Sequence, residues 1–283
     1  MNPEPPVTNA VTPLLYAERE ARVAIPRNSR PGMLFRVERH RWLALGEDAL
    51  PDDEHWLSPG EAEVLARLRY TKRRTEYLLR RLVTKHAVAS VTGCSIDPAD
   101  LAGIEVRNAP SGAPFVCVDG DPVDLGVSIS DRAGWAVCVT CPTESPTVGC
   151  DLELVEPRTP GFVADFLTSA EQRLVAAHHE PDAAANLIWS AKESALKVLQ
   201  TGLRRDTRSV EVTLDEPGED GWGALTVRAV EGPVFPGWWR RDGRFVLTTA
   251  AEVTHPPPAP LGDPGVLTLA EPRHSWVDRP LHH

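Results

Sequence analysis

Hydrophobic and polar positions along the chain predict alternating helices and strands. A helix is expected to begin at Ser58, with Pro59 at its first position and Glu61 completing a capping box. The helical spacing continues, with a break near Tyr70, until Gly93 ends it. Short apolar runs predict strands at residues 33–37, 103–107, 114–118, 127–130 and 135–140.

The same order of elements recurs in the second part of the chain. Thr168 and Glu171 form another capping box, a helix is expected over residues 186–200, and Gly202 ends it. Strands are expected at residues 210–214, 224–228 and 244–249. Ser58 and Thr168 are 110 residues apart. We therefore predict an α+β fold of two similar halves, a pseudo-dimer that arose by internal duplication, with the active site in the cleft between them.

These elements divide the chain into four parts. Residues 1–30 are rich in proline and are expected to form a loose lead-in before the first half, residues 31–145. The second half spans residues 146–252. Residues 253–283 form a proline-rich tail that cannot be a central strand. Trp42 is expected in a connecting stretch of the first half.

Composition adds the class of protein. The 283 residues are 42% hydrophobic and 25% charged, which is typical of a globular chain. No apolar run reaches the roughly 18–20 residues of a membrane span, and the N-terminus lacks the features of a signal peptide, so we expect a cytoplasmic protein without a membrane partner. The five cysteines, including the pair Cys138 and Cys141, are expected to be buried and reduced.

Charge is unevenly distributed. A net charge of −10 argues against a general nucleic-acid binder. Between Arg67 and His86, however, the only acidic residue is Glu76, against eight arginines and lysines. This basic stretch is either a solvated helix face or a contact for an anionic partner such as a phosphate or an acidic protein.

Candidate chemistry lies in the second half. In the apolar run 148–154, Asp151 and Glu153 alternate with hydrophobic residues, so in a strand both carboxylates share one face. Further on, Glu193 and Lys197 are four residues apart and share one helical face.

If that helical face meets the strand, three carboxylates surround one point. Mg²⁺ prefers such oxygen ligands and usually keeps waters and substrate phosphates, so the pattern predicts a phosphate-bearing substrate. The alternative is an acid pair in solvent and a surface Glu193–Lys197 pair that contributes only ~0.3–0.5 kcal/mol.

Two blocks, about 40 residues apart, carry a resemblance to a known family. The first, Gly149-Cys150-Asp151-Leu152-Glu153, resembles the G-[IV]-D-x-E motif of the Sfp-type 4'-phosphopantetheinyl transferases. The second, residues 189–197, resembles their W-[ST]-x-K-E-[SA]-x-x-K motif. The resemblance implies an α+β pseudo-dimer. It also implies Mg²⁺-dependent transfer of the 4'-phosphopantetheine arm of coenzyme A to a serine of an acyl or peptidyl carrier protein in secondary metabolite biosynthesis. A monomer is expected.

The resemblance also implies roles for particular residues. Asp151, Glu153 and Glu193 would bind the metal. Glu193 would take the serine proton, and Lys192 and Lys197 would stabilise the leaving bisphosphate.

A third block, residues 72–81, resembles the K-R-x-x-E-[FHY]-x-x-G-R element of the siderophore-type branch. Arg73 and Arg81 would contact the phosphates of coenzyme A, and Arg80 stands where glycine is usual.

Two further positions depart from the family pattern. Residues 128–132 stand at S-[IL]-[ST]-H-[SC], where Ser130 and Arg132 would contact the donor and Asp131 replaces the usual histidine. Ala113 replaces a usual cation. Asp131 would repel a phosphate that it faced.

Several readings follow from these departures. Arg132 replaces the lost charge and the transferase works, or the pocket takes a donor with fewer phosphates, or the chain has kept the fold and only binds carrier proteins. An enzyme of another class, a Mg²⁺-dependent phosphohydrolase, would use the same three carboxylates and an activated water.

Overall fold

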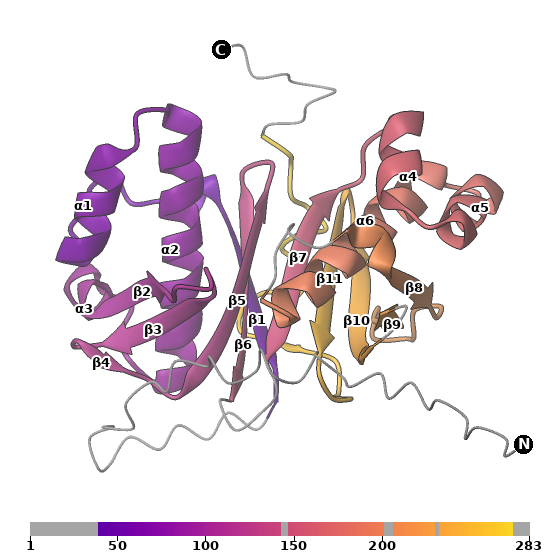
Figure 1. Cartoon of the computed structure of the whole chain (residues 1–283). Coiled ribbons are helices and arrows are strands. Elements are labelled where there is room, and N and C mark those ends of the chain that lie inside the picture. The colour runs from indigo at the N-terminus through magenta and orange to yellow at the C-terminus, as the bar shows by residue number, and fades with distance from the viewer. Residues whose placement is uncertain (1–38, 143–146, 201–205, 230–231, 274–283) are drawn as a thin grey trace, which may run out of the picture.

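The computed structural model describes residues 39–142, 147–200, 206–229 and 232–273 (Figure 1). The lead-in expected at 1–30 and the strand expected at 33–37 lie outside the described residues. Helices and strands are mixed along the chain and the strands form three sheets, so the predicted α+β class is confirmed.

The elements before residue 143 are one short strand, three helices and five further strands. They are β1 (Arg41–Gly46), α1 (Pro59–Arg67), α2 (Thr71–Thr92), α3 (Pro98–Gly103), β2 (Ile104–Asn108), β3 (Pro114–Val118), β4 (Asp121–Pro122), β5 (Leu125–Arg132) and β6 (Trp135–Pro142). The break predicted near Tyr70 separates α1 from α2. Trp42 was expected in a connecting stretch, and that prediction is wrong, because it lies in β1 with 1% of its surface exposed.

The later elements follow a similar order. They are β7 (Val148–Leu154), α4 (Pro160–Phe166), α5 (Ser169–Ala177), α6 (Pro181–Val198), β8 (Val210–Leu214), β9 (Gly223–Ala229), β10 (Val234–Asp242), β11 (Phe245–Ala251) and β12 (Ala259–Pro260). Helix α6 begins five residues before the predicted start, with Pro181 at its first position. Sequence reasoning missed β10, which contains Pro236.

Each of the two larger sheets has a long helix against it (Figure 1). The four-stranded sheet has the order β12-β1-β6-β5 and packs on α2, and the five-stranded sheet has the order β7-β11-β10-β9-β8 and packs on α6. The third sheet is the short β2-β3-β4. Strands β5 and β7 lie side by side at the junction of the two larger sheets.

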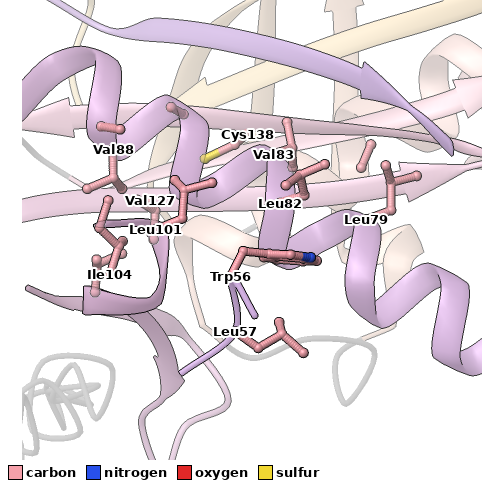
Figure 2. Close-up of a cluster of buried hydrophobic side chains, with 14 of the residues drawn as sticks. Trp56, Leu57, Leu79, Leu82, Val83, Val88, Leu101, Ile104, Val127 and Cys138 are labelled. Carbon is pink, nitrogen blue, oxygen red and sulfur yellow. The ribbon is translucent and has the colours of Figure 1, made fainter. Parts of the chain in front are cut away.

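The hydrophobic core has three buried clusters. One lies around α2, and Figure 2 shows Trp56, Leu79 and Leu82 in it. The second lies between α6 and strands β8 to β11. The third combines residues of β1 and β6 with residues of β7 and β11, and therefore joins the two larger sheets.

A buried glutamate and lysine pair anchors the long helix α2. Glu61 closes the capping box with Ser58, and its Oε1 accepts a bond from the backbone N–H of Val106 at 3.0 Å. Lys85 is fully buried and places its Nζ 2.6 Å from Glu61 Oε2. Its remaining donors reach the carbonyl oxygens of Trp56 and Leu101, both at 2.9 Å.

The same contacts recur around α6. Glu171 closes the capping box with Thr168, and its Oε1 accepts a bond from the backbone N–H of Val212 at 2.9 Å. Lys192 is fully buried with its Nζ 2.7 Å from Glu171 Oε2. Breaking such a pair leaves an uncompensated buried charge, which costs about 3–5 kcal/mol. The first pair therefore fixes α2 against α1 and β2, and the second fixes α6 against α5 and β8.

The C-terminal part of the chain, expected to be a tail, packs across both larger sheets. Residues 255–273, here called the strap, contain β12, which pairs with the edge of β1 in a parallel register. The backbone N–H of Leu261 donates to Trp42 O at 2.8 Å, and the N–H of Arg273 donates to Ala133 O at 2.9 Å. Between them Leu267 is fully buried. Because β12 lies at a sheet edge, the expectation that this segment cannot be a central strand holds.

Among the described residues no helix is long and apolar enough to cross a lipid bilayer. Of the five cysteines, which are all free, four are buried and Cys94 is partly exposed.

A buried imidazole pair where β1 meets the strap predicts acid sensitivity. His40 is 4% exposed, its ring centroid lies 3.9 Å from that of His255, and neither of its ring nitrogens has a hydrogen-bond partner among the described residues. Burial, with a smaller contribution from His255, lowers the pKa of His40 to about 3. The unfolded chain therefore binds more protons below pH 6.5.

We expect the wild type to lose about 2 kcal/mol of unfolding free energy between pH 6.5 and pH 5 through His40 alone. His40→Phe should lose correspondingly less over the same interval. Urea titrations of both proteins at a series of pH values measure the difference. Parallel pH profiles would show that His40 is not held in its neutral form.

Candidate functional site

Helix α6 and strand β7 approach each other so closely that only a glycine fits between them. A Cβ atom on Gly149 would lie 1.9 Å from the backbone oxygen of Ser194, far inside any allowed contact. The glycine therefore allows the helix to lie directly on the strand that carries Asp151 and Glu153. Any larger residue would separate the two elements.

The contact brings together the strand acids and one face of α6. Trp189 Nε1 donates to Glu153 Oε1 at 3.0 Å, and Lys197 Nζ donates to Asp151 Oδ1 at 3.0 Å. Glu193 lies between these two residues on the same helical face. The residues on the opposite face of β7 are buried in the core: Cys150, Leu152 and Leu154 are at most 1% exposed. The predicted meeting of helix face and acid strand is therefore present.

Strand β5 contributes the third side of the site. Ser130 donates to Asp151 Oδ1 at 2.8 Å. Arg132, two residues further along the same strand, places its Nε 3.2 Å from Glu153 Oε2 and donates from Nη2 to Glu156. The two residues expected to contact a donor thus contact the acids.

Sequence reasoning missed Arg158 and Glu156. Arg158 Nη2 donates to Glu153 Oε2 at 3.0 Å and its Nε donates to Asn186 Oδ1 at 2.6 Å. Its guanidinium also lies over the ring of Phe162, 4.6 Å from the centroid. Both missed residues follow the acid strand by two to four positions, and this nearness was the only signal in the sequence.

Burial and like charge set the proton affinities of the site. Burial, then the charge of Asp151, raises the pKa of Glu193 to about 7, while Lys197 opposes the rise. Burial acts to lower the pKa of Lys197, but the combined effect of Asp151, Cys150 and Glu193 outweighs burial, and the pKa of Lys197 is raised. At neutral pH Glu193 can therefore both accept and release a proton, as a general base must.

Two carboxylate oxygens of the site are buried without a hydrogen-bond partner among the described residues. They are Asp151 Oδ2 and Glu193 Oε1. A buried carboxylate oxygen without a partner is costly, so the two oxygens fit a bound cation. Two carboxylates completed by water and phosphate oxygens are a usual set of ligands for Mg²⁺.

Both carboxylate oxygens of Glu153, in contrast, have partners. Its oxygens are taken by Trp189, Arg132 and Arg158. In line with this, the described residues include no group of three His, Cys, Asp or Glu side chains placed to hold a metal ion. Of the three carboxylates expected to bind a metal, two have an oxygen without a partner among the described residues, and Glu153 does not.

Lys192 lies outside the site, and its expected contact with a leaving group needs correction. Besides Glu171, its Nζ bonds the carbonyl oxygens of Phe166, Thr207 and Val210 at 3.0 to 3.2 Å. An ammonium group has three donors and no more, so none remains for a ligand. Burial lowers the pKa of Lys192, and Glu171 opposes that effect.

The basic residues of α2 have partners within the chain. Arg73 lies at the exposed start of the helix, 3.7 Å from Glu76. Arg81 is largely buried, with its Nε 3.7 Å from Glu61 and its guanidinium stacked 4.4 Å from the Tyr77 ring centroid. Neither residue contacts the acid site through any bond that the described residues show.

Two departures from the family pattern contact each other. Arg80 Nη1 donates to Asp131 Oδ1 at 2.8 Å. The arginine that stands in place of glycine therefore offsets the aspartate that stands in place of histidine. Ala113, the other departure, lies in the loop before β3, where its N–H donates to Ser111 Oγ at 3.3 Å.

The part of the chain that contains the acids is similar to known proteins. Residues 147–242 match the 4'-phosphopantetheinyl transferase superfamily. The chain is also 27% identical over 184 residues to the 4'-phosphopantetheinyl transferase of Bacillus subtilis, covering 63% of this chain and 74% of the relative. The superfamily match spans β7 and α6, and with them Asp151, Glu153, Glu193 and Lys197. It excludes Ser130 and Arg132 on β5.

Removing a buried negative charge from the cluster is expected to stabilise the ligand-free protein. Because the pKa of Glu193 is higher in the folded state, the folded chain binds more protons between pH 4.5 and about 7, and stability falls as pH rises through that interval. At pH 8, the unfolding free energy of Glu193→Gln should therefore exceed that of the wild type by roughly 1–3 kcal/mol. Its melting temperature should be higher accordingly. The two proteins should converge near pH 4. Calorimetric melting in the presence of a metal chelator tests this, and a less stable variant at pH 8 would contradict it.

Replacing Lys192 is expected to damage folding. Lys192→Met leaves Glu171 charged and unpaired in the interior, at a cost of about 3–5 kcal/mol. The matched change on the other long helix, Lys85→Met, should cost a similar amount. Urea unfolding measures both. A stable Lys192→Met protein that binds coenzyme A more weakly would contradict this, and would support contact of Lys192 with the leaving bisphosphate.

Proposed function

We propose that the protein transfers the 4'-phosphopantetheine arm of coenzyme A to a serine of an acyl or peptidyl carrier protein. The observation that carries the proposal is the meeting of Asp151 and Glu153 with the Trp189, Glu193 and Lys197 face of α6, inside the segment that matches the superfamily. The similarity to the Bacillus subtilis transferase supports it.

Asp151, Glu193 and Lys197 would each have a separate role in the transfer. A magnesium ion held by Asp151 and Glu193 would neutralise charge on the donor's pyrophosphate. Glu193, directly or through a metal-bound water, would accept the proton of the carrier serine as the serine oxygen bonds to phosphorus and the bond to the adenosine bisphosphate breaks. Lys197 keeps its positive charge beside Asp151 and would stabilise the charge on the leaving bisphosphate.

The donor would lie over the first half of the chain. Arg73 is largely exposed and is free to swing toward a phosphate, whereas Arg81 would first have to leave Glu61. Ser130 and Arg132 border the acids and are the nearest donors of hydrogen bonds on β5. The sequence of residues 72–81 is what favours the siderophore-type branch.

We further propose that the two halves are duplicates arranged as a pseudo-dimer. The support is chemical as well as topological. Glu61 with Lys85, and Glu171 with Lys192, each combine a capping box, a buried ion pair and a bond to a strand N–H. Recurrence of three linked contacts by chance is far less expected than recurrence of a helix.

Mass spectrometry of carrier proteins tests the activity. Incubation of a panel of apo carrier proteins with the enzyme, Mg²⁺ and coenzyme A should add one phosphopantetheine to at least one of them. Asp151→Asn should abolish the gain and remain folded, because it removes a charge that two neighbouring acids repel. Arg241→Gln, a change in a surface ion pair, is the matched control and should keep the gain.

Other outcomes point to the other readings. Release of a nucleotide product from coenzyme A without any carrier protein would favour a phosphohydrolase. Tight carrier binding with no mass gain, unaffected by a chelator, would favour a non-catalytic binding protein.

A further inference from the structure

Acidic side chains outnumber basic side chains at the site. Four carboxylates lie there, on Asp151, Glu153, Glu156 and Glu193, against three cationic side chains, on Arg132, Arg158 and Lys197. With all four carboxylates ionised, the surplus is one negative charge. A phosphate group approaching this cluster is repelled until a divalent cation turns the surplus to one positive charge.

The two arginines on Glu153 are held very differently. Arg158 has directed bonds from two nitrogens, to Glu153 and Asn186, and stacks on Phe162. Arg132 Nε lies 3.2 Å from Glu153 Oε2, yet it is buried and makes no hydrogen bond among the described residues. The contact of Arg132 with Glu153 is therefore an ion pair without good hydrogen-bond geometry.

Such a guanidinium is poised to exchange partners. It stays anchored through its Nη2 to Glu156, which is 4% exposed, while its Nε and remaining donors are available for a better acceptor. A phosphate offers oxygens that a guanidinium binds with two parallel bonds. Glu153, once released, offers an oxygen to a cation.

We propose that Arg132 is a positioning residue that moves from Glu153 to the phosphate of the donor when a divalent cation binds. The proposal rests on the proposed function, and it adds an order to it: the cation binds first, frees Arg132 from Glu153, and so creates the phosphate contact. Arg158 keeps its place and holds the strand end that carries Glu153.

Binding calorimetry separates this role from a structural one. For Arg132→Gln we expect Mg²⁺ alone to bind more tightly than to the wild type, by a few fold or more, because a competing cation is gone. Coenzyme A in the presence of Mg²⁺ should bind roughly tenfold more weakly, because its phosphate loses a partner. Opposite shifts of the two affinities are the signature of an exchange.

Two further variants guard the interpretation. Arg132→Lys keeps the positive charge but cannot donate two parallel hydrogen bonds to a phosphate. Its Mg²⁺ affinity should therefore stay near the wild-type value, while coenzyme A should still bind more weakly. Arg241→Gln removes a positive charge from a surface ion pair with Glu180. This variant should change neither the Mg²⁺ affinity nor the coenzyme A affinity. Melting curves first establish that each variant is folded.

Three results would overturn the proposal. Weaker Mg²⁺ binding in a folded Arg132→Gln protein would show that the residue only supports the site. Unchanged coenzyme A binding would show that it does not reach the phosphate. Equal coenzyme A affinity with and without Mg²⁺ in the wild type would remove the order of binding. Because these measurements need no carrier protein, their outcome is separate from failure of the transfer assay.

Discussion

The site depends on one steric constraint, the direct contact of α6 with β7 at Gly149. Without that contact, Trp189 could not reach Glu153 and Lys197 could not reach Asp151, because both bonds cross the same interface. The contact also removes water from the carboxylates, which strengthens their mutual repulsion and raises the proton affinity of Glu193. Packing and electrostatics are therefore not separate properties of this site, since the close approach of two backbones produces the charge environment.

The neutralising groups come from several elements, and this explains which parts of the site could be predicted. Asp151, Glu153, Glu193 and Lys197 lie on two regular elements, so strand and helix periodicity suffices to place them on facing surfaces. The partners of Glu153 come from β5 and from the segment after β7. No periodicity relates Arg158 to Glu153, because an irregular turn sets their spacing, and only the folded chain shows the contact.

Lys192 illustrates a different limit of sequence reasoning. On the helix it neighbours Glu193, and a resemblance by motif gave both residues a chemical role. Adjacent helical residues point in directions about 100° apart, however, so Lys192 enters the core while Glu193 faces the strand. Helices α1, α2, α5 and α6 and most of the longer strands followed from capping boxes, glycines and apolar runs. The short helices α3 and α4 and the strands β1 and β10 did not, because the helices are only one to two turns long and the two strands lack a clear alternation of apolar and polar residues.

The strap has a consequence for synthesis of the protein. Strand β1 comes early from the ribosome, but its outer edge is completed only when β12 pairs with it, after more than two hundred further residues. Until then the edge exposes unpaired backbone groups, the state in which strands associate wrongly. Pairing over so long a sequence separation is also slow. A late folding step therefore joins β1 to the strap, and a ribosome stalled before residue 259 would carry a protein in which this edge of the sheet is still unpaired.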